Sequence, residues 1–162
     1  MPMTPEQLLA RLDELGLATT THRHAPVYTV AESKELRGDL PGGHCKNLLL
    51  RDHKGELWLL VTLEDRVLDL KALRHAIGSG RLSFAKPGQL QETLGVDPGT
   101  VTPFALVNDR ERRVQVVLDR EMMRCRPLNY HPLTNAATTA IEPEDLLIFI
   151  RNCGHEPRVI DL

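Results

Sequence analysis

Apolar residues recur along the chain in stretches whose spacing alternates between helical and extended periods. Four stretches carry leucine or isoleucine at the i, i+3, i+4 spacing that predicts an amphipathic helix. They cover residues 4–15, 68–78, 86–95 and 142–154. The first is the best defined, because Thr4 and Gln7 can form a capping box around Pro5. A further helix is predicted over residues 29–36, beginning at Thr29.

Shorter apolar runs with β-branched residues, bounded by turn residues, predict strands. They cover residues 19–24, 46–52, 56–63, 81–85, 104–109 and 113–119. The runs 46–52 and 56–63 flank a tight turn and predict a β-hairpin. Residues 56–63 are nearly all apolar, which predicts a central strand. Residues 126–141 show neither period and are predicted to be irregular.

This order of elements predicts the fold class. Helices and strands alternate irregularly, with hairpins among them, which favours a mixed-sheet α/β or α+β fold. A chain of 162 residues can bury one sizeable core, so residues 1–162 are expected to form a single domain. Aromatic residues make up 4% of the chain, so leucine and valine must fill that core.

Composition narrows the range of partners and compartments. The formal net charge is −2, so the protein is not expected to attract nucleic acid non-specifically, and any RNA contact must be local. DNA is not an expected partner. Three widely spaced cysteines without a CxxC pair predict neither a disulfide framework nor a zinc site. No apolar run approaches a membrane span and no signal peptide is visible, so a cytoplasmic location is expected.

Lys46 is the first candidate for chemistry. It stands where a loop enters an apolar strand, so its ammonium could reach a pocket at the edge of the sheet. A lysine whose stem lies on the sheet and whose charge stays in water would give the same pattern. Asn47 should point to the opposite face of a regular strand, so both side chains cannot line one pocket unless the strand is irregular.

The segment from Gly99 to Pro103 is the second candidate. Glycine permits close approach of a ligand to the backbone, and proline fixes the exit of the turn. Exposed amides in such a loop could stabilise a carbonyl oxygen on which negative charge develops. An ordinary turn before a strand explains the spacing equally.

Hydrogen-bonding side chains are concentrated in the irregular segment around His131. They are Asn129, His131, Thr134, Asn135, Thr138 and Thr139. Such a density suits recognition of a polar substrate, and the histidine could donate, accept or relay a proton. Turn formation by Asn and Thr is the alternative explanation. The other histidines show no pattern that marks them.

Other enzyme classes find weaker support. A thiol hydrolase could be built from Cys45 with His44 or His131, but neighbours on a strand point to opposite faces, which places His44 poorly. The chain has no GxSxG elbow, no glycine-rich phosphate loop and no visible set of metal ligands, so no cofactor or metal is expected.

Three motifs together resemble one family. Residues 42–52 (GGHCKNLLLRD), 99–109 (GTVTPFALVND) and 129–141 (NYHPLTNAATTAI) are similar to the free-standing relatives of the prolyl-tRNA synthetase editing domain, in the YbaK/ProX superfamily. The resemblance covers essentially the whole chain and is greatest to the branch that removes alanine from mischarged proline tRNA. It implies a single domain with a mixed, curved sheet flanked by helices.

The resemblance also implies roles for individual residues. The family's essential lysine falls on Lys46, where it would anchor the terminal nucleotide of the tRNA. The implied catalytic set is Lys46, Gly99, Thr100, Val101, Thr102 and His131. The implied substrate-binding set is Val27, Tyr28, Asn47, Pro103, Phe104, Asn129, Thr134 and Asn135. Val27 and Tyr28 would form part of the wall against the amino-acid side chain.

The activity implied is a trans-editing aminoacyl-tRNA deacylase that hydrolyses alanyl-tRNA of the proline type. Its partners would be the acceptor end of that tRNA and, as the candidate protein partner, prolyl-tRNA synthetase. The family is thought to use the free hydroxyl of the terminal ribose to help activate water. Two alternatives stay open: the same chemistry on cysteine- or serine-mischarged tRNA, and a module that binds tRNA 3′ ends without turnover.

Overall fold

A mixed β-sheet forms the centre of the protein. The computed structural model describes residues 1–26, 31 and 40–162, and within them eight strands pair in the order β1-β7-β6-β2-β3-β5-β8, with β4 on β2. The strands are β1 (Thr20–Arg23), β2 (Gly43–Asp52), β3 (Leu57–Leu63), β4 (Leu82–Phe84), β5 (Val114–Asp119), β6 (Leu128–Tyr130), β7 (Ala137–Ile141) and β8 (Arg158–Ile160). The predicted mixed α/β class is confirmed.

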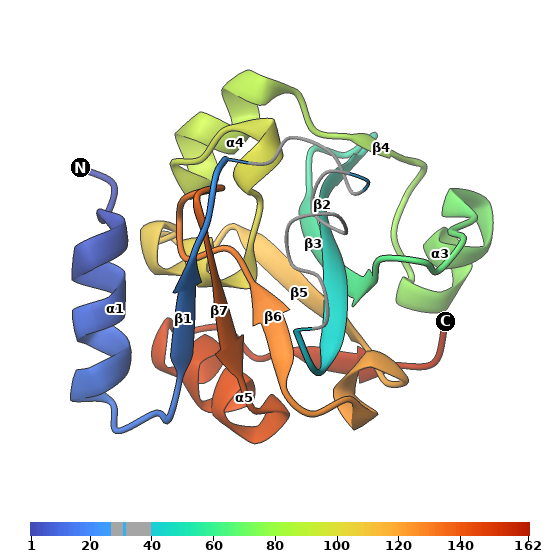
Figure 1. Cartoon of the computed structure of the whole chain (residues 1–162). Coiled ribbons are helices and arrows are strands. Elements are labelled where there is room, and N and C mark those ends of the chain that lie inside the picture. The colour runs from blue at the N-terminus through green and yellow to red at the C-terminus, as the bar shows by residue number, and fades with distance from the viewer. Residues whose placement is uncertain (27–30, 32–39) are drawn as a thin grey trace.

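Helices cover both faces of this sheet (Figure 1). The α-helices are α1 (Pro5–Glu14), α3 (Leu70–Ile77), α4 (Pro87–Leu94) and α5 (Pro143–Asn152), and the 3-10 helices are η1 (Pro98–Thr100), η2 (Pro103–Asn108) and η3 (Met122–Arg124). One core packs α1, α4, α5 and η2 against one face, and a smaller one packs α3 against the other. Alternate residues of β3 contribute to the two cores, as strand geometry requires.

The predicted hairpin and its central strand are confirmed. β2 and β3 pair antiparallel, with Lys46 opposite Thr62 and Asn47 opposite Val61. β3 also pairs parallel with β5, so it has a neighbour on each side. All its residues except Leu63 are buried. The capping box of α1 is present as well, since Gln7 N–H donates to the Thr4 hydroxyl and Thr4 N–H donates to the Gln7 side chain.

Two predictions of secondary structure are wrong. Residues 104–109 were expected to form a strand, but they lie mostly in η2, where Thr102 caps the helix by accepting a hydrogen bond from Phe104 N–H. Several consecutive apolar residues are buried there, a pattern that a helical turn packed into the core shares with a central strand. Residues 126–141 were expected to be irregular, yet they contain β6 and β7. The helix predicted over residues 29–36 lies almost entirely outside the described residues.

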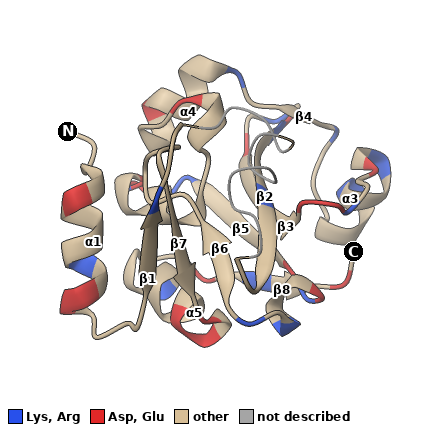
Figure 2. Cartoon of the chain, viewed as in Figure 1, with Lys and Arg blue, Asp and Glu red and all other residues tan. Residues whose placement is uncertain are grey.

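Charged side chains of both signs are interspersed over the helices (Figure 2). This mixture is in keeping with the small net charge of the chain. Among the described residues, no helix is long and apolar enough to cross a membrane.

A buried hydrogen-bonded pair joins the segment after α5 to the turn before β5. His155 Nε2 lies 2.9 Å from Asp109 Oδ2, and both side chains are almost fully buried. The same carboxylate accepts hydrogen bonds from the N–H groups of Arg113 and Val114. Burial alone would raise the pKa of Asp109, but the hydrogen bonds from His155, Val114 and Arg113 outweigh it and hold the pKa below its ordinary value.

We expect Asp109→Asn to lower the free energy of unfolding by about 1–3 kcal/mol at pH 7, because the buried donors lose a charged acceptor. A depressed carboxyl pKa stabilises the fold above the unfolded-state value, about 3.9, and this contribution is lost as pH falls through the folded-state value. The difference between wild type and variant should therefore shrink from pH 5 downward in urea titrations. Exposed Asp13→Asn serves as the control, and a difference that stays constant with pH would contradict this assignment.

Candidate functional site

The site is organised by a close approach between the start of β2 and the start of β6. Gly43 and His44 pair parallel with Leu128 and Asn129. A Cβ atom on Gly43 would lie 2.8 Å from the Cβ of Cys125, closer than side chains tolerate. Gly42 has φ +101°, and a Cβ there would lie 2.2 Å from the Pro127 carbonyl oxygen. The two consecutive glycines therefore permit the contact that brings these segments together.

Asn129 fixes this contact from the β6 side. Its Nδ2 donates to the carbonyl oxygens of Pro41 and Gly43, each at 3.1 Å, and the residue is buried. Both amide hydrogens are thereby used within the protein. Asn129 was predicted to bind substrate, and the structure places it beside the cavity with its donors already engaged.

A small polar cavity lies where β2, the end of β3, β6 and β7 meet. Its volume is about 40 Å³. A water molecule needs about 10–15 Å³ of such volume, so the cavity has room for a few waters or a small chemical group. The described residues that line it are His44, Cys45, Asn47, Glu64, Asn129, Tyr130, His131 and Thr138.

His131 presents a neutral imidazole to this cavity. Its Nδ1 lies 2.9 Å from the Ala137 carbonyl oxygen, which can only accept, so Nδ1 carries the proton. Burial lowers the pKa of His131, and the nearby His24 lowers it further, while the hydrogen bond to Ala137 opposes both. In the neutral ring Nε2 then carries a lone pair and can accept a hydrogen bond.

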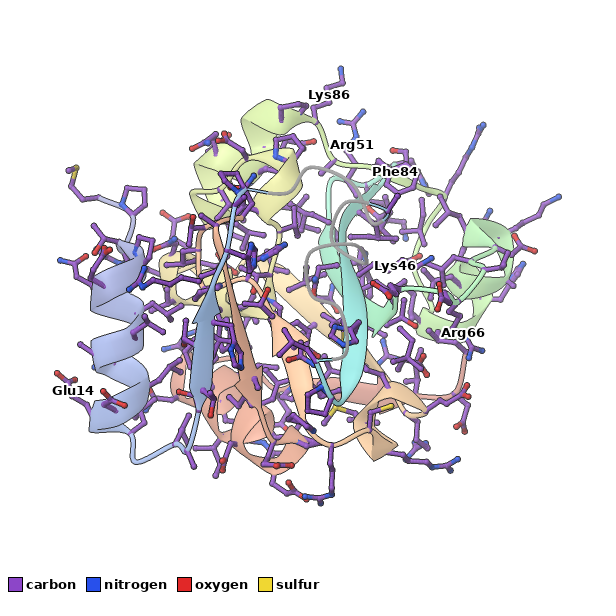
Figure 3. All side chains as sticks on the ribbon, viewed as in Figure 1. Glu14, Lys46, Arg51, Arg66, Phe84 and Lys86 are labelled. Carbon is purple, nitrogen blue, oxygen red and sulfur yellow. The ribbon has the colours of Figure 1, made fainter. Side chains whose placement is uncertain are left out.

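The structure separates Lys46 from Asn47, as strand alternation predicts. Asn47 lines the cavity, and its buried Oδ1 has no hydrogen-bond partner among the described residues. Lys46 points toward the α3 side of the sheet, where its Nζ donates to the Arg66 carbonyl oxygen (Figure 3). Arg66 follows Glu64, which lines the cavity, by two residues.

The Gly99–Pro103 loop contributes none of the described residues that line the cavity. The loop leads into the core behind the cavity. Phe104, the residue after the loop, is fully buried, and its ring packs edge-on against Tyr130, which also lines the cavity. Of the loop's predicted amide donors, Thr100 N–H already donates to the Asp97 carbonyl within η1. Phe104, predicted to bind substrate, is thus placed in the core.

The remaining predicted residues are less informative. The Thr134 hydroxyl accepts a hydrogen bond from Ala136 N–H, which is the turn-forming role that threonine often has. Asn135 also takes part in an interaction within the protein. Val27 and Tyr28 lie outside the described residues.

The structure disfavours Cys45 as a nucleophile. Burial raises the pKa of its thiol to about 12, because the thiolate would lose its hydration. The reactive thiolate is therefore scarce at neutral pH. No group of three His, Cys, Asp or Glu side chains within the described ranges is placed to hold a metal ion.

Sequence reasoning missed three residues at or beside the cavity: His24, Glu64 and Tyr130. His24 Nε2 lies 2.8 Å from the Thr138 hydroxyl, and its ring centre lies 6.3 Å from that of His131. Glu64 reaches the cavity from the end of β3. His24 follows β1, which pairs with β7, and this pairing of distant segments leaves no local signal in the sequence.

Comparisons with known proteins agree on one family. A model of the aminoacyl-tRNA editing domain matches residues 24–149. The chain is 37% identical over 164 residues to the prolyl-tRNA editing protein ProX of Acetoanaerobium sticklandii, and the match covers 100% of both chains. It is 39% identical over 160 residues to the prolyl-tRNA synthetase associated domain-containing protein 1 of Xenopus laevis, covering 96% of this chain and 95% of that one.

Solved structures share the fold. One described as a candidate trans-editing enzyme for prolyl tRNA synthetase superposes with a TM-score of 0.74 at 21% identity, covering 98% of this chain and 96% of that chain. Another, the hypothetical protein APE2540, gives a TM-score of 0.75 at 21% identity and covers 94% and 97%. With the family model matching most of the chain, the resemblance seen in the sequence is confirmed: the chain belongs to the aminoacyl-tRNA editing domain family.

Proposed function

We propose that the protein is a trans-editing deacylase that hydrolyses the ester of alanyl-tRNA of the proline type. The observation that carries this proposal is the small polar cavity beside a neutral His131, in a chain whose full-length relative is named a prolyl-tRNA editing protein. The substrate would be the acceptor 3′ end of the tRNA, and prolyl-tRNA synthetase would be the protein from which it comes.

The cavity volume supports a size limit on the amino acid. A synthetase site built for proline cannot strongly reject the smaller alanine, because each missing methylene changes binding by only about 1–3 kcal/mol. A second site that excludes proline can remove what the first accepted. A volume of about 40 Å³ admits only a small group, which is in keeping with a site that limits the size of the amino acid.

Hydrolysis needs water to attack the ester carbonyl. In the proposed reaction, His131 Nε2 and the free hydroxyl of the terminal ribose accept hydrogen bonds from the attacking water. The carbonyl oxygen becomes an oxyanion that needs hydrogen-bond donors; the donors predicted from the sequence, the amides of Gly99, Val101 and Thr102, are not among the described residues that line the cavity. The water oxygen bonds to the carbonyl carbon as its proton passes to His131 Nε2. The ester C–O bond then breaks, the ribose oxygen takes that proton from His131, and alanine and free tRNA are released.

Lys46 would act on the nucleic acid rather than on the ester. Within the described part of the chain, the hydrogen-bond partner of its ammonium is the Arg66 carbonyl, and no carboxylate forms an ion pair with it. Its positive charge can therefore attract a phosphate of the terminal nucleotide. Correct placement of the ester would follow from that contact.

Purified protein should hydrolyse alanyl-tRNA of the proline type faster than the cysteinyl, seryl and prolyl esters of the same tRNA. Lys46→Ala should lower kcat/KM by about 100-fold, the effect expected when a charged contact to the substrate is lost. Lys54→Ala, an exposed lysine in the β2–β3 turn, is the matched control and should match wild type.

Other outcomes separate the alternatives. Preference for the cysteinyl or seryl ester would keep the chemistry and change the substrate. Tight binding of the tRNA without hydrolysis of any ester would contradict the deacylase and support a binding module.

The pH profile tests the role of His131. Because its pKa lies below the ordinary value of about 6.5, the ring stays neutral at pH 7, and Nε2 remains an acceptor until the pH falls further. We expect kcat/KM for the alanyl ester to be constant down to about pH 6.5 and to fall below it. His131→Gln should lose activity and this acid limb together. A variant that keeps both would show that His131 has no part in the reaction.

A further inference from the structure

Arg66 joins three segments of the chain at the α3 side of the sheet (Figure 3). Its guanidinium contacts Glu121 Oε2 at 2.8 Å and lies 3.9 Å from Asp119 Oδ2. The same group donates to the carbonyl oxygen of Leu162. Its own carbonyl oxygen accepts the hydrogen bond from Lys46 Nζ. One residue therefore binds the end of β5, the segment after β8 and the lysine of β2.

The backbone at Arg66 is held by contacts on both sides of the residue. Residues 66–69 belong to neither a helix nor a strand. Arg66 N–H donates to the Leu63 carbonyl, and Glu64 N–H donates to the His44 carbonyl, which together hold the beginning of the turn. The guanidinium contacts hold the Arg66 side chain, while the next residue, Val67, is almost fully exposed and Leu68 packs against the α3 core.

One of the two carboxylates that hold Arg66, that of Asp119, is itself fixed. Asp119 is buried, and it accepts hydrogen bonds from the Thr62 hydroxyl at 2.7 Å and from Glu121 N–H at 3.0 Å. Thr62 lies directly opposite Lys46 in the β2–β3 pair. The network thus runs from Asp119, at the buried end of β5, through Arg66 to Lys46, which faces Thr62 across the hairpin.

We propose that Arg66 is a positioning residue for Lys46: its guanidinium, held by Asp119 and Glu121, sets the carbonyl that holds the Lys46 ammonium ready for the substrate. This inference rests on the proposed function, in which Lys46 binds the terminal nucleotide. Arg66 acts through Lys46 and is not required to touch the substrate.

A double-mutant cycle tests this coupling. Under single-turnover conditions with the alanyl ester, Arg66→Ala should lower kcat/KM by about 10-fold, because the hydrogen bond that positions the Lys46 ammonium is weakened. Arg66→Lys, which keeps the charge near Asp119, should recover part of the loss. In the Lys46→Ala background, Arg66→Ala should cause no further loss.

Arg120→Ala is the matched control. Arg120 also pairs with a carboxylate, Asp161, and also donates to a backbone carbonyl, that of Val159, but it has no contact with Lys46. It should leave the rate unchanged. If Arg66→Ala proves unstable because Asp119 loses its counter-charge, Glu121→Gln removes the charge from the shorter of the two carboxylate contacts, at an exposed position, and should give a smaller loss that also vanishes in the Lys46→Ala background.

A measurement without substrate separates this inference from the proposed function. The ¹⁵N signal of the Lys46 ammonium should shift in Arg66→Ala and stay unchanged in Arg120→Ala, whether or not any ester is hydrolysed. An unshifted signal, or a loss of activity that persists in full without Lys46, would overturn the coupling. If wild type hydrolyses no ester, the deacylase proposal is contradicted, and the ¹⁵N signal alone then tests the coupling between Arg66 and Lys46.

Discussion

The close approach of β2 to β6 is the contact on which the site depends. Gly42 and Gly43 remove the side chains that would collide with Pro127 and Cys125, and Asn129 then bonds the two segments together. The pairing covers two residue pairs, Gly43 with Leu128 and His44 with Asn129. The residues of β2 and β6 that line the cavity all lie within a few residues of this contact. A short parallel ladder therefore sets how these two sides of the site face each other.

Strand β2 directs polar side chains of the site to both faces of the sheet. Because side chains alternate, Asn47 reaches the cavity while Lys46 reaches the α3 side and the Arg66 carbonyl. A substrate that uses both must pass along the end of the sheet rather than enter one closed pocket. A tRNA 3′ end, with its amino acid at one end and phosphates along its length, has the extended shape that such an arrangement suits.

Sequence patterns predicted the parts of the fold that local periodicity specifies. The capping box of α1, the β2–β3 hairpin and the buried central strand are all read from neighbouring residues, and all are confirmed. Pairings between distant segments left no such signal, so β6 and β7 were missed and His24 was overlooked. The 104–109 segment was misread because its apolar run fits either a strand or a tight helix against the core.

Some residues singled out from the sequence have roles in the structure that differ from the predicted ones. Asn129 was assigned to substrate binding from the polar density around His131, whereas its amide hydrogens hold the backbone of residues 41–43. Phe104 was assigned to substrate binding because it directly follows the Gly99–Pro103 segment, and the structure places it in the core against Tyr130 and Phe149. The alternation argument for Lys46 and Asn47 needed only strand geometry, which is why it predicted their separation.

The activity of Gly43→Ala tests most directly whether the β2–β6 contact makes the site. Gly88→Ala is the control, because a Cβ at Gly88 has no heavy atom within 4 Å and adds a favoured residue to the start of α4. If the contact makes the site, Gly43→Ala loses hydrolysis of alanyl-tRNA by 10-fold or more while circular dichroism shows that it is folded, and Gly88→Ala equals wild type. Equal activity of all three proteins would contradict the account.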